Sequence, residues 1–414
     1  MAELIEIKEE QERFILVGVA LSDNDDTQES LNELEELANT AGALTVGMVI
    51  QNRGSIHPGT YIGKGKIDEV RELIDEMDAT GVVCDDELSP AQLRNLEDAL
   101  QTKVLDRTIL ILDIFASRAS TKEGKIQVEL AQLRYRSTRL VGLRNSLSRL
   151  GGGIGTRGPG EKKLEMDRRL IKERISVLKR ELNNVKKTRE TERVLRSKNR
   201  IPVVAIVGYT NAGKSTLLNR LTNAGVLEED KLFATLDPTT RNLALESGQQ
   251  ILLTDTVGFI RKLPHHLIDA FRSTLEEAKY ADIILHVVDS SNPDVYNQMH
   301  IVYDTLKNLG IQDKTIITAF NKQDKIEEEQ ILKDFHADYT VKMSVKTGMG
   351  LTKLLELIEK VLNERKVLVE KVISYQDAGK IQIIRKYGQL LEEEYQQDGI
   401  YIKAYIPNDI LNSL

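Results

Sequence analysis

The stretch I-P-V-V-A-I-V-G-Y-T-N-A-G-K-S-T, residues 201–216, decides the fold of the chain around it. Its apolar run Val203–Val207 is typical of a buried parallel strand, and the glycines that follow lead into a helix that carries leucines. This is the G-x-x-x-x-G-K-[ST] pattern in the strand–loop–helix context that it requires. Backbone N–H groups at the start of such a helix close around phosphate, because the helix dipole favours negative charge there. We therefore expect a phosphate loop in which Lys214 contacts the β- and γ-phosphates and Ser215 ligates Mg²⁺.

The later motifs of residues 199–364 identify the nucleotide. After the strand I-L-L-T comes D-T-V-G, where Asp255 would hold Mg²⁺ through water and Gly258 would offer its N–H to a γ-phosphate. The strand from Thr315 ends in N-K-Q-D, and the carboxylate of Asp324 can accept from both N1–H and the N2 amine of guanine, an arrangement that adenine cannot satisfy. N-K-Q-D alone is also a plausible surface turn. In this order, with each motif behind its own apolar strand, the motifs predict a GTPase.

The residues expected to bind the nucleotide fall into groups along the chain. They are Gly208, Tyr209, Thr210, Asn211, Ala212, Gly213, Lys214, Ser215 and Thr216 in the phosphate loop; Phe233, Ala234, Thr235, Leu236 and Asp237 in the switch; Asp255, Thr256, Val257 and Gly258; Asn321, Lys322 and Asp324; and Ser344, Val345 and Lys346 in the loop that backs the base. Lys214 and Gly258 would act in catalysis, and Ser215 and Asp255 would serve the metal.

The switch, K-L-F-A-T-L-D-P-T-T-R from Lys231, needs a threonine that closes over Mg²⁺ and the γ-phosphate and is released on hydrolysis. Thr235, Thr239 and Thr240 are all candidates on chemistry alone. Position 259, directly after D-T-V-G, is phenylalanine where many GTPases have the glutamine that orients the attacking water. Because Phe259 cannot do this, we expect slow intrinsic hydrolysis and a water that is positioned by another group, by a bound cation or by a partner.

The two ends of the chain predict smaller domains. Residues 1–120 are expected to form a small parallel α/β domain, because strand-like and helix-like runs alternate over residues 13–119. One helix begins S-P-A-Q at Ser89, with Gln92 placed for a capping box. The loop Y-I-G-K-G-K from Tyr61 could contact phosphate, or it is a glycine turn with surface lysines. Residues 365–414 read as a strand, a short helix and a hairpin that turns near Asp398, a small α+β domain that shows no chemistry of its own.

Residues 121–198 are predicted to form two long helices with heptad-like apolar spacing, most simply an antiparallel pair. Residues 121–200 hold 23 Lys and Arg against 9 Asp and Glu, a balance of +14 in a chain whose net charge is −7. The connection Gly151–Gly160 is longer than a helix hairpin usually needs. One interpretation is a solvated face of a linker. The other is a basic finger whose loop approaches RNA, with phosphates contacted by Arg134, Arg136, Arg139, Lys162, Lys163, Arg168 and Arg169.

Composition sets the class of protein. With 414 residues, of which 41% are hydrophobic and 29% charged, the chain has the composition of a globular protein and the length of two to four domains. The single cysteine, Cys84, excludes an internal disulfide and fits a reducing compartment. No apolar run approaches the roughly 18 residues that span a bilayer, and the acidic start M-A-E-L-I-E-I-K-E-E is unlike a secretion signal. We expect a cytoplasmic protein without stable membrane association.

The expected fold class is α/β. A P-loop GTPase domain with a mostly parallel sheet would be preceded by a small parallel α/β domain and a long antiparallel helical pair, and followed by the small α+β domain. These parts resemble the HflX family of translational GTPases over essentially the whole chain. The resemblance rests on the α/β N-terminal domain, the loop S-R-L-G-G-G-I-G-T-R-G-P-G-E (148–161) beside a basic helix, the switch F-A-T-L-D-P-T-T-R (233–241) and D-T-V-G-F-I (255–260).

The resemblance implies roles that the residues alone leave open. It favours Thr235 as the catalytic switch threonine and a Mg²⁺ ligand. Asn211 resembles the P-loop asparagine through which some related GTPases bind K⁺, and an asparagine that only stabilises the loop is the alternative. The family also implies ribosome-stimulated hydrolysis, and GTP-dependent dissociation of stalled or idle ribosomes under stress such as heat shock.

The implied partner is the large ribosomal subunit, bound near its catalytic centre. The residues that would contact ribosomal RNA are Gly151, Gly152, Gly153, Ile154, Gly155, Thr156, Arg157, Gly158, Lys162 and Lys163. We expect no DNA partner and a monomer. Two other functions stay open at this point, a signalling switch that acts on a protein partner and an NTPase of ribosome assembly or RNA remodelling.

Overall fold

The structure, a computed structural model, describes residues 11–22, 26–150, 159–198, 201–222, 232–233, 238–264, 267, 277–311, 313–326, 331–364 and 366–407. The chain forms two compact units. The first consists of Met1–Val185, Lys231–Phe233 and Arg261–Phe271, and the second of Lys186–Asp230, Ala234–Ile260 and Arg272–Leu414.

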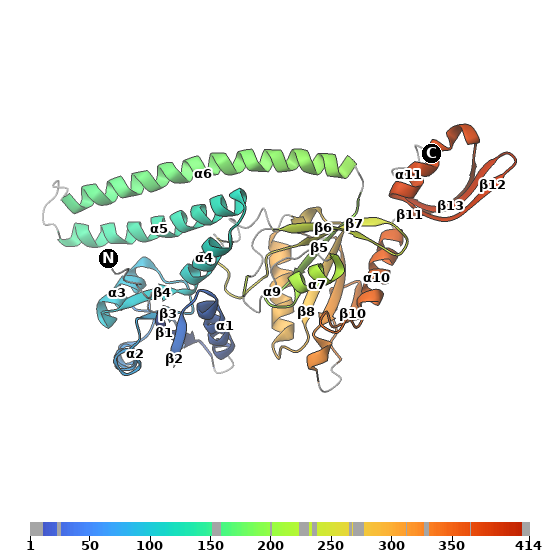
Figure 1. The fold of residues 1–414 in the computed structure, drawn as a ribbon. Helices are drawn as coiled ribbons and strands as arrows, with labels where there is room; N and C mark the ends of the chain where they lie inside the picture. The colour runs from blue at the N-terminus through green and yellow to red at the C-terminus, as the bar shows by residue number, and fades with distance from the viewer. Residues whose placement is uncertain are drawn as a thin grey trace, which may run out of the picture. The chain divides into compact units, whose positions relative to one another are not determined.

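The first unit contains a four-stranded parallel sheet of order β2-β1-β3-β4. Its strands are β1 (Arg13–Ala20), β2 (Leu44–Asn52), β3 (Gly81–Cys84) and β4 (Lys103–Asp106), and its helices are α1 (Thr27–Thr40), α2 (Lys64–Met77), α3 (Pro90–Leu100) and α4 (Arg107–Arg118). β1 is buried over almost its whole length, because a central parallel strand is covered on both faces. The predicted parallel α/β domain is confirmed (Figure 1).

Two helices of this unit begin at side-chain caps. Ser89 Oγ accepts from the Gln92 N–H at 3.2 Å, and Gln92 Oε1 accepts from the Ser89 N–H at 3.0 Å, so the predicted capping box starts α3. The Asp106 carboxylate accepts from the Ile109 N–H at 3.1 Å and starts α4. Caps of this kind stabilise a helix by about 1 kcal/mol each.

The first unit also contains the predicted antiparallel helices, α5 (Lys122–Leu150) and the part of α6 (Pro159–Lys198) up to Val185. Figure 1 shows the two helices side by side. Their shared apolar cluster consists of Ile126, Leu130 and Leu133 from α5 with Ile175, Leu178 and Leu182 from α6. α5 also packs on α3 and α4. The heptad spacing therefore predicted the packing correctly.

The second unit is built on a six-stranded sheet of order β10-β9-β8-β5-β7-β6. Its strands are β5 (Val203–Gly208), β6 (Thr239–Ala244), β7 (Gln250–Asp255), β8 (Ile283–Asp289), β9 (Thr315–Asn321) and β10 (Tyr339–Lys342), and the described helices include α7 (Lys214–Thr222), α9 (Val295–Asn308) and α10 (Leu351–Glu364). Only β6 runs antiparallel to its neighbour among these strands. The parallel order brings the carboxyl ends of β5, β7 and β9, which carry the nucleotide motifs, to one edge.

The end of the chain folds as the predicted small α+β domain. It has an antiparallel sheet of order β11-β13-β12, made of β11 (Lys366–Ile373), β12 (Gln389–Gln396) and β13 (Gly399–Pro407), with α11 (Gly379–Tyr387) against it. Ile381 and Ile384 of α11 share a buried cluster with alternate residues of β13, as expected for a sheet with one buried face.

Candidate active site

The phosphate loop lies between β5 and α7, as its sequence predicts. Gly213 has a φ of +96°, and a Cβ there would lie 2.5 Å from Asn321 Nδ2, so a larger residue would be both strained and blocked. Asn211 has a φ of +58°, a conformation that asparagine tolerates better than most residues. α7 starts at Lys214, and its first backbone N–H groups are therefore available to a phosphate.

Lys214, and the Ser215 and Asp255 oxygens that are expected to serve Mg²⁺, lie beside this loop. Lys214 is buried and its Nζ donates to the Tyr209 carbonyl at 2.7 Å. Burial lowers the pKa of Lys214 to about 8, although the Asp255 carboxylate acts in the opposite direction. The Ser215 hydroxyl donates to Asp255 Oδ2 at 2.8 Å, and Asp255 is fully buried at the end of β7. One hydroxyl and one carboxylate side by side fit Mg²⁺, which takes its remaining ligands from phosphates and water.

Gly258 and Phe259 lie directly against the phosphate loop. A Cβ on Gly258 would lie 2.8 Å from Thr210 Cγ2 and 3.0 Å from Lys214 Nζ. The Phe259 N–H donates to the Gly208 carbonyl at 3.1 Å, and the Phe259 carbonyl accepts from the Thr210 N–H at 2.8 Å. The phenyl ring is only 1% exposed. Phe259 is thus a packing residue, and the expectation that its side chain orients no water fits this position.

Two other residues of the D-T-V-G motif support the fold. The Thr256 hydroxyl donates to the Ile206 carbonyl at 2.8 Å, which ties the end of β7 to β5, and Val257 is buried. Their side chains hold the strands in place, and contacts of their backbone with a nucleotide stay a prediction.

Asn321 connects two loops of the site. It is 3% exposed, its Nδ2 donates to the Ala212 carbonyl at 2.9 Å, and its Oδ1 accepts from the Val345 N–H at 3.0 Å. The asparagine of N-K-Q-D therefore fixes the phosphate loop and the base-backing loop relative to each other. Spacing predicted that this residue belongs to the site, but it did not show that its amide is used in this way.

The carboxylate expected to contact the base, that of Asp324, is held by its neighbour Ser344. Asp324 Oδ1 accepts from Ser344 Oγ at 2.6 Å, and this hydrogen bond lowers the pKa of Asp324. An ionised carboxylate is the form that accepts two hydrogen bonds from guanine. Lys322, in a left-handed conformation with φ of +60°, pairs with Asp289 at 2.7 Å, while Lys346 is exposed. The structure thus brings together the phosphate loop, the Ser215 and Asp255 oxygens expected to serve Mg²⁺, and the residues expected to contact the base.

Part of the predicted switch lies outside the described residues, namely Ala234, Thr235, Leu236 and Asp237. Phe233 is described, and its ring packs on Phe115 of α4 with centroids 4.6 Å apart, inside the first unit. Its side chain is therefore committed to that contact. Of the other two threonine candidates, Thr239 lies opposite Asp255 in the β6–β7 register and the Thr240 hydroxyl pairs with that of Thr254 at 3.0 Å.

The residues proposed for RNA contact are only partly described. Gly151, Gly152, Gly153, Ile154, Gly155, Thr156, Arg157 and Gly158 lie outside the described residues, and Lys162 and Lys163 lie in α6. Arg139 is 14% exposed, pairs with the buried Asp106 at 2.6 Å and lies over the Tyr135 ring, and its contact with RNA stays a prediction. Its basic charge is used inside the first unit.

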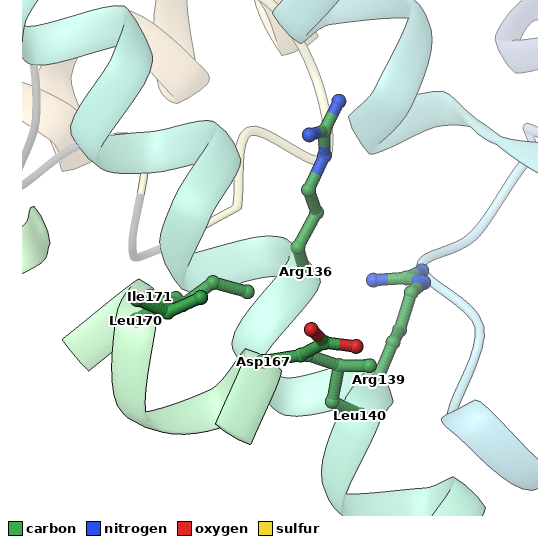
Figure 2. A pocket seen from close by; sticks show the side chains of 6 residues that line it. All are labelled: Arg136, Arg139, Leu140, Asp167, Leu170 and Ile171. Carbon is green, nitrogen blue, oxygen red and sulfur yellow. The ribbon is translucent and has the colours of Figure 1, made fainter. Parts of the chain in front are cut away.

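An open pocket of about 500 Å³ lies between α5 and α6. Figure 2 shows its lining, with Arg136, Arg139 and Leu140 from α5 and Asp167, Leu170 and Ile171 from α6. The surface beside it is not uniformly basic, because Arg169 pairs with Glu173 at 2.9 Å and Arg174 pairs with Glu129 at 2.7 Å.

Sequence reasoning missed Arg261 and Lys262, which follow D-T-V-G-F-I directly. Arg261 is 7% exposed and both side chains form ion pairs within the first unit. The available signals were this basic pair beside a switch motif and the acidic pair Asp85-Asp86 after the strand G-V-V-C.

None of the helices among the described residues has the length and apolar character needed to cross a membrane.

Sequence comparison with known proteins gives matches along most of the chain. Family models described as "GTP-binding GTPase N-terminal", "GTP-binding GTPase Middle Region" and "50S ribosome-binding GTPase" match residues 28–116, 118–196 and 203–322. The chain is 69% identical to the GTPase HflX of Lacrimispora saccharolytica, over 100% of this chain and 98% of that one. It is 44% identical to the GTPase HflX of Escherichia coli (strain K12), over 84% and 82% of the two chains.

Among solved structures, the chain is similar to a GTP-binding protein of Sulfolobus solfataricus in complex with GDP, at 25% identity and a TM-score of 0.45, over 85% of this chain and 99% of that one. The family models and the full-length relatives agree with a phosphate loop followed by the N-K-Q-D motif of a GTPase. The chain therefore belongs to the HflX family of GTPases.

Proposed function

We propose that this GTPase binds the large ribosomal subunit through the tip of the α5–α6 pair and dissociates stalled or idle ribosomes into subunits under stress such as heat shock. The charge distribution carries this proposal, because residues 121–200 hold 23 basic against 9 acidic residues in a chain of net charge −7. Ribosomal RNA is a polyanion, and a basic segment on an acidic protein directs that segment toward it. The family model over residues 203–322 is described as a 50S ribosome-binding GTPase and supports the same partner.

The position of Phe259 adds a reason for a partner. Its ring is buried and its backbone is paired with the phosphate loop, so the attacking water must be oriented by another group. We propose that the ribosome completes the active site, with Mg²⁺ held through Ser215 and Asp255 and by Thr235, and K⁺ held at Asn211. A function on ribosomes would be carried out in the cytoplasm, and we propose that location.

The first experiment measures GTP hydrolysis alone and with large ribosomal subunits, in potassium and in sodium buffer. We expect strong stimulation by subunits, and a potassium requirement if Asn211 holds the ion. Equal, slow hydrolysis in all four conditions would contradict the proposal and favour a protein partner.

The second experiment tests the tip by charge reversal. The triple variant Arg157→Glu, Lys162→Glu, Lys163→Glu should lose binding to large subunits and dissociation of intact ribosomes, because the glutamates release no counterions from RNA and are repelled by its phosphates. A matched control reverses Lys64, Lys307 and Lys353, which are exposed on α2, α9 and α10, by the same total charge. Equal loss in both variants would mean that net charge, and not the tip, drives binding.

A further inference from the structure

The side-chain hydroxyl of Thr210, in the phosphate loop, is buried and has no hydrogen-bond partner among the described residues. Thr210 is 7% exposed, and its Oγ1 is covered by the protein. Buried polar groups are nearly always paired, because a group that loses water without a new partner costs free energy. The phosphate-loop pattern accepts any residue at this position, so the pattern alone gives the hydroxyl no role. An unpaired polar group inside a binding site indicates a role toward the ligand.

The backbone of Thr210 is fixed against Phe259, the residue that follows D-T-V-G. The Thr210 N–H donates to the Phe259 carbonyl at 2.8 Å, and the Phe259 N–H donates to the Gly208 carbonyl at 3.1 Å. Tyr209 and Phe259 also form a parallel β-bridge. These residues all belong to the second compact unit. Because the backbone is held and threonine is β-branched, the hydroxyl moves only by rotation about χ1, between staggered positions.

The side chain of Thr210 lies on the side of the loop where the γ-phosphate is expected. A Cβ on Gly258 would lie 2.8 Å from Thr210 Cγ2 and 3.0 Å from Lys214 Nζ, so the methyl group and the ammonium approach the same point. Gly258 and Lys214 are the residues that the motifs assign to the γ-phosphate. A change of rotamer would place Oγ1 where Cγ2 now lies, facing Gly258. The hydroxyl is therefore one rotation away from this point.

A phosphate oxygen is a suitable partner for this hydroxyl. Phosphate oxygens are anionic acceptors, and a hydroxyl that donates to one of them forms a charge-assisted hydrogen bond. The β-phosphate is expected to bind elsewhere in the loop, at the backbone N–H groups where α7 begins with Lys214. GDP ends at the β-phosphate and would leave the Thr210 hydroxyl without this partner, whereas GTP would supply it.

We propose that the Thr210 hydroxyl donates a hydrogen bond to the γ-phosphate of GTP, and that Thr210 thereby makes the site prefer GTP to GDP. The hydrogen bond forms only when the third phosphate is present, so its free energy adds to GTP binding alone. This inference rests on the GTPase activity and does not involve the ribosome. It can therefore fail while the proposed function holds, and the proposed function can fail while it holds.

The test measures binding of a non-hydrolysable GTP analogue and of GDP to the full chain, without ribosomes. Thr210→Val keeps the branched shape and removes the hydroxyl. Its affinity for the analogue should fall about tenfold, the lower end of what a hydrogen bond to a charged group contributes. Its affinity for GDP should not change. Thr210→Ser keeps the hydroxyl and should bind the analogue about as tightly as wild type.

Stability separates this role from a structural one. In the nucleotide-free protein, Thr210→Val replaces an unpaired hydroxyl by a methyl group, so denaturant titration should give an unfolding midpoint no lower than that of wild type. Thr318→Val is the matched control, because the Thr318 hydroxyl is buried in β9 and donates to Asp334 Oδ2 at 2.6 Å. The control should unfold at lower denaturant and leave the ratio of the two nucleotide affinities unchanged.

Unchanged analogue binding by Thr210→Val, or an equal loss of affinity for the analogue and for GDP, would overturn the proposal. Analogue binding by Thr210→Ser as weak as by Thr210→Val would also overturn it, because the lost methyl group and not the hydroxyl would then be responsible. A fall in the unfolding midpoint of Thr210→Val as large as in the control would mean that the protein itself pairs the hydroxyl, which contradicts the proposal as well.

Discussion

Replacement of Asp324 by asparagine should change which base the protein prefers. The Asp324 carboxylate is fixed by the hydrogen bond from Ser344 Oγ at 2.6 Å, and asparagine can keep that bond through Oδ1 while its Nδ2 becomes a donor. The donor then faces the N2 amine of guanine, which is also a donor. Xanthine has a carbonyl oxygen at the same place and would accept from it.

The size of the effect follows from the two hydrogen bonds that guanine gives to the carboxylate. Bonds to a charged group contribute about 1.5–3 kcal/mol each. Asp324 lies toward solvent, so we take the lower value, and the loss of both bonds is about 3 kcal/mol. This corresponds to an affinity for GDP roughly a hundredfold lower. Xanthosine diphosphate should bind the variant at least about tenfold more tightly than GDP does.

The assay is equilibrium titration of wild type and variant with both nucleoside diphosphates, followed by fluorescence of a labelled nucleotide. Asp324→Ala serves as the control, because it removes the acceptor without adding a donor and should bind both bases weakly. Equal affinity of the asparagine variant for the two bases, or GDP binding as tight as in wild type, would refute the assignment of Asp324 to the base.

Three other predictions concern the phosphate loop and the helical pair. The pKa of Lys214 is about 8 before nucleotide binds, and phosphate must raise it, so GDP affinity should be constant below about pH 7 and fall by up to about tenfold per pH unit above pH 8. Gly213→Ala should abolish GDP binding, because φ is +96° and the Cβ position is blocked, whereas Gly248→Ala, at φ of +80° with open space, should not. Arg139→Gln should lower the free energy of unfolding by about 2 kcal/mol, since it leaves the buried Asp106 without its cation, and should leave ribosome binding unchanged.

Each of these has a result that contradicts it. For Lys214 the check is calorimetry at pH 8 in two buffers of different ionisation enthalpy, and equal heats would mean that no proton is taken up. For Gly213, binding that survives in the alanine variant would show that the loop can shift. For Arg139, loss of ribosome binding at unchanged stability by denaturant titration would return this residue to the RNA surface.

Local spacing explains why the nucleotide site could be predicted from sequence. The phosphate loop is a contiguous run, and D-T-V-G and N-K-Q-D each follow an apolar strand, so the order of a parallel sheet places them at one edge. The amide of Asn321, by contrast, bonds to a carbonyl 109 residues away, at Ala212. No periodic pattern in the sequence predicts a hydrogen bond between residues that far apart.

Charge was the least reliable signal in the sequence, because ion pairs also join residues that lie far apart in the chain. Arg139 belongs to a basic run, yet it neutralises Asp106, 33 residues earlier in the chain. Lys262 neutralises Asp85, 177 residues earlier. A sequence shows how many charges a segment holds but not which of them are paired, and pairing decides whether a charge reaches a partner.

The buried ring of Phe259 limits what its side chain can do in the reaction. A GTPase whose 259 side chain is packed into the protein cannot vary its rate through that side chain, and its backbone is already paired with Gly208 and Thr210. The group that orients the attacking water must therefore come from elsewhere, as proposed for the ribosome.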